Sequence, residues 1–249
     1  MGDGHRSHAA AIMKDTMEQP VPTPPELGEH EGLSYALFVP EGGAEVGVVI
    51  LHGAGSAKES HFDFARGCRA DGMAALAYDA RGHGRSRGAF GPGAIEDALA
   101  MVGLLGRQVG QVALRGSSMG GFQAIHAAAR EPSLCAVVAI CPAPDDLLLR
   151  SIRAREPLRF ECDVPAMETW LESMNVYEAV GRLGPRTALL LLHARGDEQI
   201  PWTVSEELYA AAHDPKRLLL LPGGHHRSLQ HDLELQAVSR RWISEAARG

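Results

Sequence analysis

One serine lies in a sequence context typical of a catalytic nucleophile. Residues 116–120 read Gly-Ser-Ser-Met-Gly; they follow the apolar residues 112–114 and precede an alanine-rich stretch with helical character. Small residues two positions before and after Ser118 allow a sharp strand-to-helix turn, which exposes the serine Oγ. Because a serine hydroxyl is a weak nucleophile, it needs a base that accepts its proton and an acid that orients the base.

Candidates for the acid and the base follow later in the chain, each in a loop after an apolar run. Asp197 and Glu198 come in the first of these loops, and His225 and His226 come in the second. Loops at the carboxyl ends of parallel strands meet at one edge of a sheet, so these side chains can converge on Ser118. We predict Asp197 as the acid, because it directly follows a glycine and its short carboxylate suits a buried partner for imidazole; Glu198 is the alternative.

Alternating apolar and amphipathic stretches predict the elements that position these loops. Apolar runs predict strands at residues 33–39, 46–51, 73–78, 111–115, 134–140, 187–192 and 217–221, and amphipathic stretches predict helices at 95–105, 119–129, 204–212 and 229–247. A Glu-Gly-Gly turn between the first two strands predicts a β-hairpin. We therefore predict an α/β protein with a mostly parallel central sheet of about eight strands and helices on both faces.

The length of 249 residues suits one domain. Residues 142–185 interrupt the alternation between two strands, and their helical, polar and aromatic patches predict a short helical cap insertion. Residues 1–25 are polar and proline-containing and lack the apolar stretch of a secretory signal, so we expect a flexible leader there. The domain itself is expected at residues 26–249.

Together these motifs resemble the α/β-hydrolase superfamily, in which nucleophile, acid and histidine follow in this order. Residues 51–55, Leu-His-Gly-Ala-Gly, are similar to its oxyanion loop, and residues 79–86, Asp-Ala-Arg-Gly-His-Gly-Arg-Ser, resemble its DxRGHGxS turn. The resemblance extends from about Leu33 to the C-terminus. The spacing usual in the family favours His226 over His225. Some relatives carry the acid after the sixth strand, which keeps Asp145 and Asp146 as alternatives.

The resemblance implies a serine hydrolase with the triad Ser118, His226 and Asp197. It also implies an oxyanion hole formed by the backbone amides of Met119 and Ala54; loss of one such donor typically slows a reaction by a factor of about 100 to 1,000. The chain is most similar to bacterial carboxylesterases of the feruloyl-esterase, monoacylglycerol-lipase and serine-aminopeptidase-like group, so we expect ester hydrolysis through an acyl-enzyme. A thioesterase, a peptidase or a C–C bond hydrolase would use the same triad, and a catalytically silent binding protein of this fold is a further alternative.

The predicted cap contains groups that could contact a substrate. Its apolar side chains could line an acyl pocket: Leu147, Leu148, Leu149, Ile152, Phe160, Met167, Trp170, Met174 and Tyr177. Four arginines also crowd the cap, at positions 150, 153, 155 and 159. A solvated helix face explains such a cluster, and attraction of a carboxylate or of the phosphates of a thioester is the alternative.

Composition and charge argue against other classes of protein. The net charge of -7 and the lack of a basic run argue against nucleic-acid binding, and no apolar run approaches a membrane span. The cluster His225, His226 and His231 lacks the usual spacing of zinc ligands, so we expect neither a metal nor a cofactor. We expect a small-molecule ester or acyl substrate, and either a monomer or a homodimer.

The spacing of the cysteines helps to predict the cellular compartment of the protein. The sequence holds four of them, without CxxC spacing: Cys68, Cys135, Cys141 and Cys162. A chain with no predicted secretory signal and no disulfide framework is expected in the cytoplasm with reduced thiols.

Overall fold

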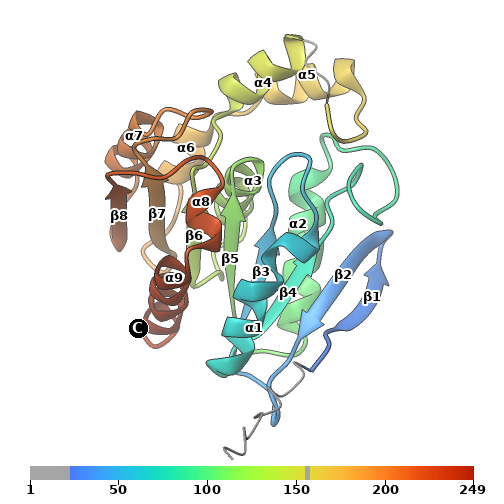
Figure 1. Ribbon diagram of the computed structural model, residues 1–249, viewed down its shortest axis with the longest axis vertical. Coiled ribbons are helices and arrows are strands. Elements are labelled where there is room, and N and C mark those ends of the chain that lie inside the picture. The colour runs from blue at the N-terminus through green and yellow to red at the C-terminus, as the bar shows by residue number, and fades with distance from the viewer. Residues whose placement is uncertain (1–22, 155–157) are drawn as a thin grey trace, which may run out of the picture.

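The computed structural model describes residues 23–154 and 158–249, which form a sheet between two layers of helices (Figure 1). The predicted fold class is confirmed: the sheet has eight strands, in the order β1-β2-β4-β3-β5-β6-β7-β8. The strands are β1 (Glu26–His30), β2 (Leu33–Phe38), β3 (Val46–Leu51), β4 (Ala74–Tyr78), β5 (Gln111–Ser117), β6 (Ala136–Ile140), β7 (Ala188–Ala194) and β8 (Lys216–Leu221).

Strands β3 to β8 are parallel, and β1 and β2 are antiparallel to their neighbours. The central strands β6 and β7 are buried along their whole length, as expected for parallel strands covered by helices on both faces. The loops that carry Ser118, Asp197 and His226 follow the carboxyl ends of β5, β7 and β8 at one edge of the sheet.

The predicted hairpin between residues 33–39 and 46–51 is wrong, because β4 lies between β2 and β3. Strand β2 instead forms a hairpin with β1 through Glu31 and Gly32, whose φ angles of 52° and 82° suit the primed turns that match strand twist. Strand β1 was not predicted, because it is a mostly exposed, polar edge strand. The expected leader at residues 1–25 lies largely outside the described residues.

The helices form two layers. A 3-10 helix (Lys58–His61), α1 (Phe62–Ala70), α8 (Ser228–His231) and α9 (Leu233–Ala246) belong to one side of the sheet, and α2 (Ala94–Gly106), α3 (Met119–Ala128) and α7 (Thr203–Ala211) belong to the other. The predicted closing helix at 229–247 is thus two helices. It breaks at Asp232, whose extended backbone and side chain cap the N-terminus of α9.

Between β6 and β7 the chain forms α4 (Asp145–Arg153), α5 (Val164–Glu172) and α6 (Val176–Gly181). Helices α4 and α5 lie above the carboxyl edge of the sheet, as the yellow segments at the top of Figure 1 show. Helix α6 packs against α3 and α7 and so belongs to the body of the domain. In the part of the chain that the structure describes, every helix is too short or too polar to cross a bilayer.

Candidate active site

Ser118 lies at the turn between β5 and α3 in a strained backbone conformation. Its φ of 55° and ψ of -118° belong to a region that residues with a side chain rarely adopt. The turn is so tight that a Cβ on Gly116 would lie 2.0 Å from the carbonyl oxygen of Gly120. A Cβ on Gly120 would lie 2.3 Å from the carbonyl oxygen of Leu51. Glycine at both positions is therefore what allows the turn to close around the serine.

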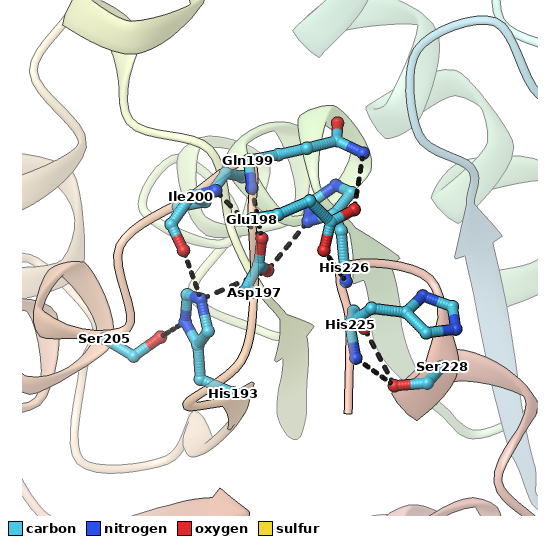
Figure 2. Close-up of polar contacts among 9 residues, drawn as sticks. All are labelled: His193, Asp197, Glu198, Gln199, Ile200, Ser205, His225, His226 and Ser228. Carbon is cyan, nitrogen blue, oxygen red and sulfur yellow. Dashed lines mark hydrogen bonds and ion pairs between the residues drawn. The ribbon is translucent and has the colours of Figure 1, made fainter. Parts of the chain in front are cut away.

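Asp197 and His226 are in direct contact. The Nδ1 of His226 lies 2.8 Å from Oδ2 of Asp197, and both side chains are buried (Figure 2). Because Nδ1 points at the carboxylate, Nε2 lies on the opposite side of the ring. His226 and Ser118 line the same small cavity of about 70 Å³. The structure thus brings all three predicted residues to one place.

The Asp197 carboxylate is surrounded by donors (Figure 2). Its Oδ1 accepts hydrogen bonds of 2.9 Å from the backbone amides of Gln199 and Ile200, and its Oδ2 also lies 3.4 Å from Nε2 of His193. Burial by itself would raise the pKa of Asp197. The hydrogen bonds from His193, His226 and the two amides outweigh burial and hold this pKa well below its usual value, so the carboxylate stays charged.

His193 is a residue of this network that was not predicted from the sequence. It is fully buried near the end of β7; its Nδ1 lies 2.7 Å from Oγ of Ser205, and its Nε2 lies 3.1 Å from the carbonyl oxygen of Ile200. A ring with its proton on Nε2 satisfies every one of these contacts, because the Ser205 hydroxyl then donates to Nδ1. The available signal was a polar residue ending an apolar strand, four positions before the acid.

The alternatives left open by the sequence lie elsewhere. Glu198 is exposed, and its Oε2 accepts a 3.1 Å hydrogen bond from the backbone amide of His226 rather than from the ring. His225 is exposed, and its backbone exchanges hydrogen bonds with Ser228 (Figure 2). Neither side chain takes part in the contact between the carboxylate and the imidazole.

The two aspartates after β6 belong to the cap. Asp145 accepts a 2.7 Å hydrogen bond from the backbone amide of Val176, and Asp146 forms an ion pair with Arg150. Asp145 thus joins α4 to the start of α6, Asp146 pairs on the exposed face of α4, and the structure brings Asp197 alone of the candidate acids to the His226 ring.

The loop at residues 53–55 is held by two histidines, of which His52 is the first. Its Nδ1 donates to the carbonyl oxygen of Gly53 at 2.8 Å, and its Nε2 accepts from the backbone amide of Ala80 at 3.0 Å. One donor and one acceptor on the same ring require neutral imidazole. Burial, the largest cause, lowers the pKa of His52 to about 4 and so maintains this state near neutral pH.

His83 holds the other end of this loop. Its Nδ1 donates to the carbonyl oxygen of Arg81 at 2.9 Å, and its Nε2 accepts from the backbone amide of Gly55 at 3.1 Å. Burial lowers the pKa of His83 as well, which favours the neutral ring that these bonds need. Phe160 from the cap stacks on His83, with ring centroids 4.6 Å apart. The cap is thereby tied to the loop that carries Ala54.

Ala54 and Met119 flank the serine. Met119 is the first residue of α3, so its amide has no acceptor within the helix. Ala54 is exposed in the middle of the loop that His52 and His83 hold. Both residues line, together with Ser118, an apolar cavity of about 160 Å³ beneath the cap. Two backbone amides beside a serine hydroxyl could supply the pair of donors that an oxyanion requires.

Side chains from both the cap and the body of the domain line the apolar cavity. Six of the nine predicted cap side chains line it: Leu147, Leu148, Ile152, Phe160, Met167 and Trp170. Phe90 and Phe122 complete the wall and were missed, because they come from distant parts of the sequence. The ring of Trp170 meets them edge-on, at centroid distances of 6.1 Å and 5.8 Å. A larger groove of about 620 Å³, lined by Gln111 and Ala188 at the amino-terminal ends of β5 and β7, contains none of these site residues.

Among residues 23–154 and 158–249, one set of side chains could ligate a metal ion. One atom each from Cys141, Asp197 and His226 lie within 4.8 Å of one another. The set differs from the histidine cluster considered in the sequence, and it overlaps the contact between the carboxylate and the imidazole. Burial raises the pKa of the Cys141 thiol, so an ion at this place would have to displace a tightly held proton.

The sequence is similar to a family model and to several known proteins. Residues 44–159 match the family model described as serine aminopeptidase, S33. The chain is 29% identical over 220 residues to an uncharacterized protein of Mycobacterium tuberculosis (strain ATCC 25618 / H37Rv), covering 83% of this chain and 72% of the relative. It is 55% identical to the uncharacterized protein YfhR of Escherichia coli (strain K12), over only 38 residues, which span 15% of this chain and 13% of that relative.

Solved structures show the same architecture at low sequence identity. The α/β hydrolase GrgF from Penicillium sp. sh18 has a TM-score of 0.74 at 18% identity, covering 87% of this chain and 95% of that one. Est1E from Butyrivibrio proteoclasticus, solved with ferulic acid bound, has a TM-score of 0.70 at 20% identity, covering 90% and 98%. This protein therefore has the α/β-hydrolase fold, and the resemblance to that superfamily is confirmed. Together with the family-model match, this supports hydrolase activity.

Proposed function

We propose that this protein is a serine hydrolase that cleaves carboxylic esters, with Ser118 as nucleophile, His226 as general base and Asp197 as the acid that orients it. The observation that carries the proposal is the 2.8 Å contact between the Asp197 carboxylate and the His226 ring, at a cavity that His226 shares with Ser118. The contact needs the proton on Nδ1, which leaves Nε2 of His226 as the acceptor for the serine proton.

The reaction proceeds in two halves. Ser118 Oγ attacks the ester carbonyl carbon while its proton passes to Nε2 of His226, and the amides of Met119 and Ala54 stabilise the resulting oxyanion. His226 then donates this proton to the leaving oxygen, the C–O bond breaks, and an acyl-enzyme remains. A water molecule, deprotonated by His226, attacks the acyl carbon, and collapse of the second tetrahedral intermediate returns the proton to Ser118.

The apolar cavity under the cap supports an apolar acyl group, because burial of such a group against these side chains is favourable. A thioesterase, a peptidase or a C–C bond hydrolase would use the same three residues. Esters are favoured because Est1E binds ferulic acid and other neighbours of this fold are named as an esterase and a monoacylglycerol lipase. A silent binding protein would have no need for the complete set of serine, histidine and aspartate.

We further propose that the protein acts in the cytoplasm on a small-molecule substrate, without a cofactor and without nucleic-acid partners. The four cysteines are free, which suits a reducing compartment. A monomer or a homodimer would serve this chemistry equally well, since every proposed group comes from a single chain.

The proposal is tested by hydrolysis of p-nitrophenyl acetate and butyrate, followed by intact mass after treatment with a fluorophosphonate probe. Wild-type protein should turn over both esters and gain one adduct, and Ser118→Ala should lose both properties. Ser133→Ala, which removes an exposed hydroxyl between α3 and β6, is the matched control and should retain both. Folded wild-type protein with neither turnover nor adduct would overturn the proposal in favour of the silent binding protein.

A further inference from the structure

Two cavities of opposite character meet at Ser118. The larger one, about 160 Å³, lies under the cap and is mostly apolar. The smaller one, about 70 Å³, is lined mainly by polar groups, among them Ser56, Gln230 and Arg227. Ala54, Ser118 and Gln199 line both cavities, so a carbonyl group held at Ser118 extends into one cavity on each side.

The proposed mechanism assigns one half of the ester to each cavity. The leaving oxygen must receive its proton from Nε2 of His226, so the alcohol half lies on the side of that ring. His226 lines the small polar cavity and is not among the residues that line the apolar one. The acyl half therefore occupies the apolar cavity, and the alcohol half occupies the polar cavity.

One arginine lines the polar cavity and a second lies beside the loop that forms part of its wall. Arg227 lines it, is exposed, and forms no ion pair within residues 23–154 and 158–249. The side chain of Arg159 packs along Gly55, beside the loop residues that line this cavity; a Cβ on that glycine would lie 2.8 Å from Cβ of Arg159. Within the described residues, no carboxylate forms an ion pair with Arg159 either.

The other cap arginines do not add to this charge. Arg150 is paired with Asp146, and Arg153 is paired with Glu172. Arg155 lies outside the described residues. The arginine cluster seen in the sequence therefore divides into a solvated, ion-paired helix face and the single residue Arg159 beside the active-site loop.

The carboxylates of the neighbouring loop already accept hydrogen bonds from other groups. The Asp197 carboxylate is buried and receives hydrogen bonds from two histidines and two backbone amides. The Glu198 carboxylate accepts from the backbone amide of His226 and is not among the groups lining the cavity. An anion in the polar cavity would thus meet the Arg227 side chain, with Arg159 beside the neighbouring Gly55, and no unpaired acid from these loops.

We propose that the small polar cavity is a leaving-group subsite for an alcohol that carries an anionic group, a carboxylate or a phosphate, recognised by Arg227 with Arg159. The substrates are then esters that join an apolar acid to an anionic alcohol. This inference rests on the proposed esterase function, since the leaving-group side is defined by the role of His226.

The test compares butyrate esters that differ only in the alcohol: 2-hydroxyethyl butyrate, butyryloxyacetate, 2-butyryloxyethyl phosphate and butyrylcholine. Release of butyrate gives kcat/KM for each ester. The two anionic esters should exceed the neutral ester, and the cationic choline ester should fall below it. The carboxylate and phosphate esters separate the two sources of negative charge. Because these charges are exposed, the preference should decline as the ionic strength rises from about 0.01 M to about 0.5 M.

Variants identify the residue responsible. Arg227→Gln should lower the ratio of kcat/KM for the anionic ester to that for the neutral ester by up to about fivefold, which corresponds to one exposed ion pair. Arg227→Lys keeps the charge and should retain most of the ratio. Arg107→Gln, an exposed arginine at the end of α2, is the matched control and should leave the ratio unchanged.

The outcomes separate this inference from the function on which it rests. Hydrolysis of the neutral ester without a preference for anionic esters, or a preference that Arg227→Gln leaves unchanged, would overturn the subsite and leave the esterase intact. Lack of turnover of every ester, together with no adduct from the fluorophosphonate probe, would overturn the esterase itself.

Discussion

Replacement of Asp197 by asparagine is a sharp test of the acid, because the surroundings determine how the new amide must lie. Oδ1 of Asp197 faces the backbone N–H groups of Gln199 and Ile200, so the amide oxygen of asparagine must take that position. Its NH₂ group then faces the ring nitrogens of His226 and His193, which at present donate to Oδ2. Both rings would have to accept a hydrogen bond where they now donate one.

The consequence for catalysis follows from the tautomer. If Nδ1 of His226 accepts from the new amide, the proton of the neutral ring lies on Nε2, which can no longer take the proton of Ser118. The equivalent change in a serine protease lowers kcat by about 10⁴, or about 5.5 kcal/mol of transition-state stabilisation. We expect a loss of this size for Asp197→Asn with p-nitrophenyl butyrate at about pH 7.5, with the circular dichroism spectrum unchanged.

The alternative candidate acids Glu198 and Asp145 provide the control variants. Glu198→Gln and Asp145→Asn keep the size of each side chain and should stay within about tenfold of wild type, because neither carboxylate contacts the His226 ring. The reasoning would be refuted if Asp197→Asn kept more than a tenth of the wild-type kcat. A thousandfold loss in either control would then identify the true acid.

Three further predictions concern stability and specificity. Burial, with smaller contributions from Arg182 and Arg130, lowers the pKa of His126 to about 4. Wild-type stability is therefore lost as the pH falls below about 6.5, whereas His126→Leu has no such group. The free energy of unfolding of His126→Leu, relative to that of wild type, should rise by about 2 kcal/mol between about pH 7.5 and pH 5.0. The same difference in the free energy of unfolding at both pH values, measured by urea denaturation, would contradict this. Gly120→Ala should lower the free energy of unfolding by about 3 kcal/mol or more, because its Cβ would meet backbone atoms. Gly103→Ala, in the open interior of α2, should raise it by about 0.5 to 1 kcal/mol. A mild effect at Gly120 would count against the tight turn. Trp170→Leu should shift the preferred p-nitrophenyl ester toward longer acyl chains, and an unchanged chain-length profile would speak against the apolar cavity as the acyl site.

Local motifs carried most of the sequence-based prediction. The glycines around Ser118 impose the turn by short-range sterics, so the strand and helix on either side could be predicted from neighbouring residues. Asp197 and His226 could be placed because parallel strands deliver their loops to one edge of the sheet. The hairpin prediction failed for the complementary reason: residues 33–39 and 46–51 look like hairpin partners locally, and only the long-range insertion of β4 separates them.

The features missed from the sequence depend on tertiary contacts. His193 acquires its role only when the loop after β7 folds back, so that Ile200 and Asp197 both come within reach of its ring. Phe90 and Phe122 line the cavity because α4 and α5 cover the carboxyl edge of the sheet. No periodicity reports these contacts, because those of His193 depend on the path of a loop and those of Phe90 and Phe122 join segments far apart in the chain.

The acid loop and the histidine loop are joined by their backbones as well as by the Asp197–His226 contact. A Cβ on Gly196 would lie 2.4 Å from the carbonyl oxygen of Gly224, which itself has a φ of 95°. Glycine at both places lets the two loops touch one residue before the acid and two residues before the histidine. This close approach of the two backbones brings the Cα atoms of Asp197 and His226 near each other, so the two side chains can meet while each loop remains short.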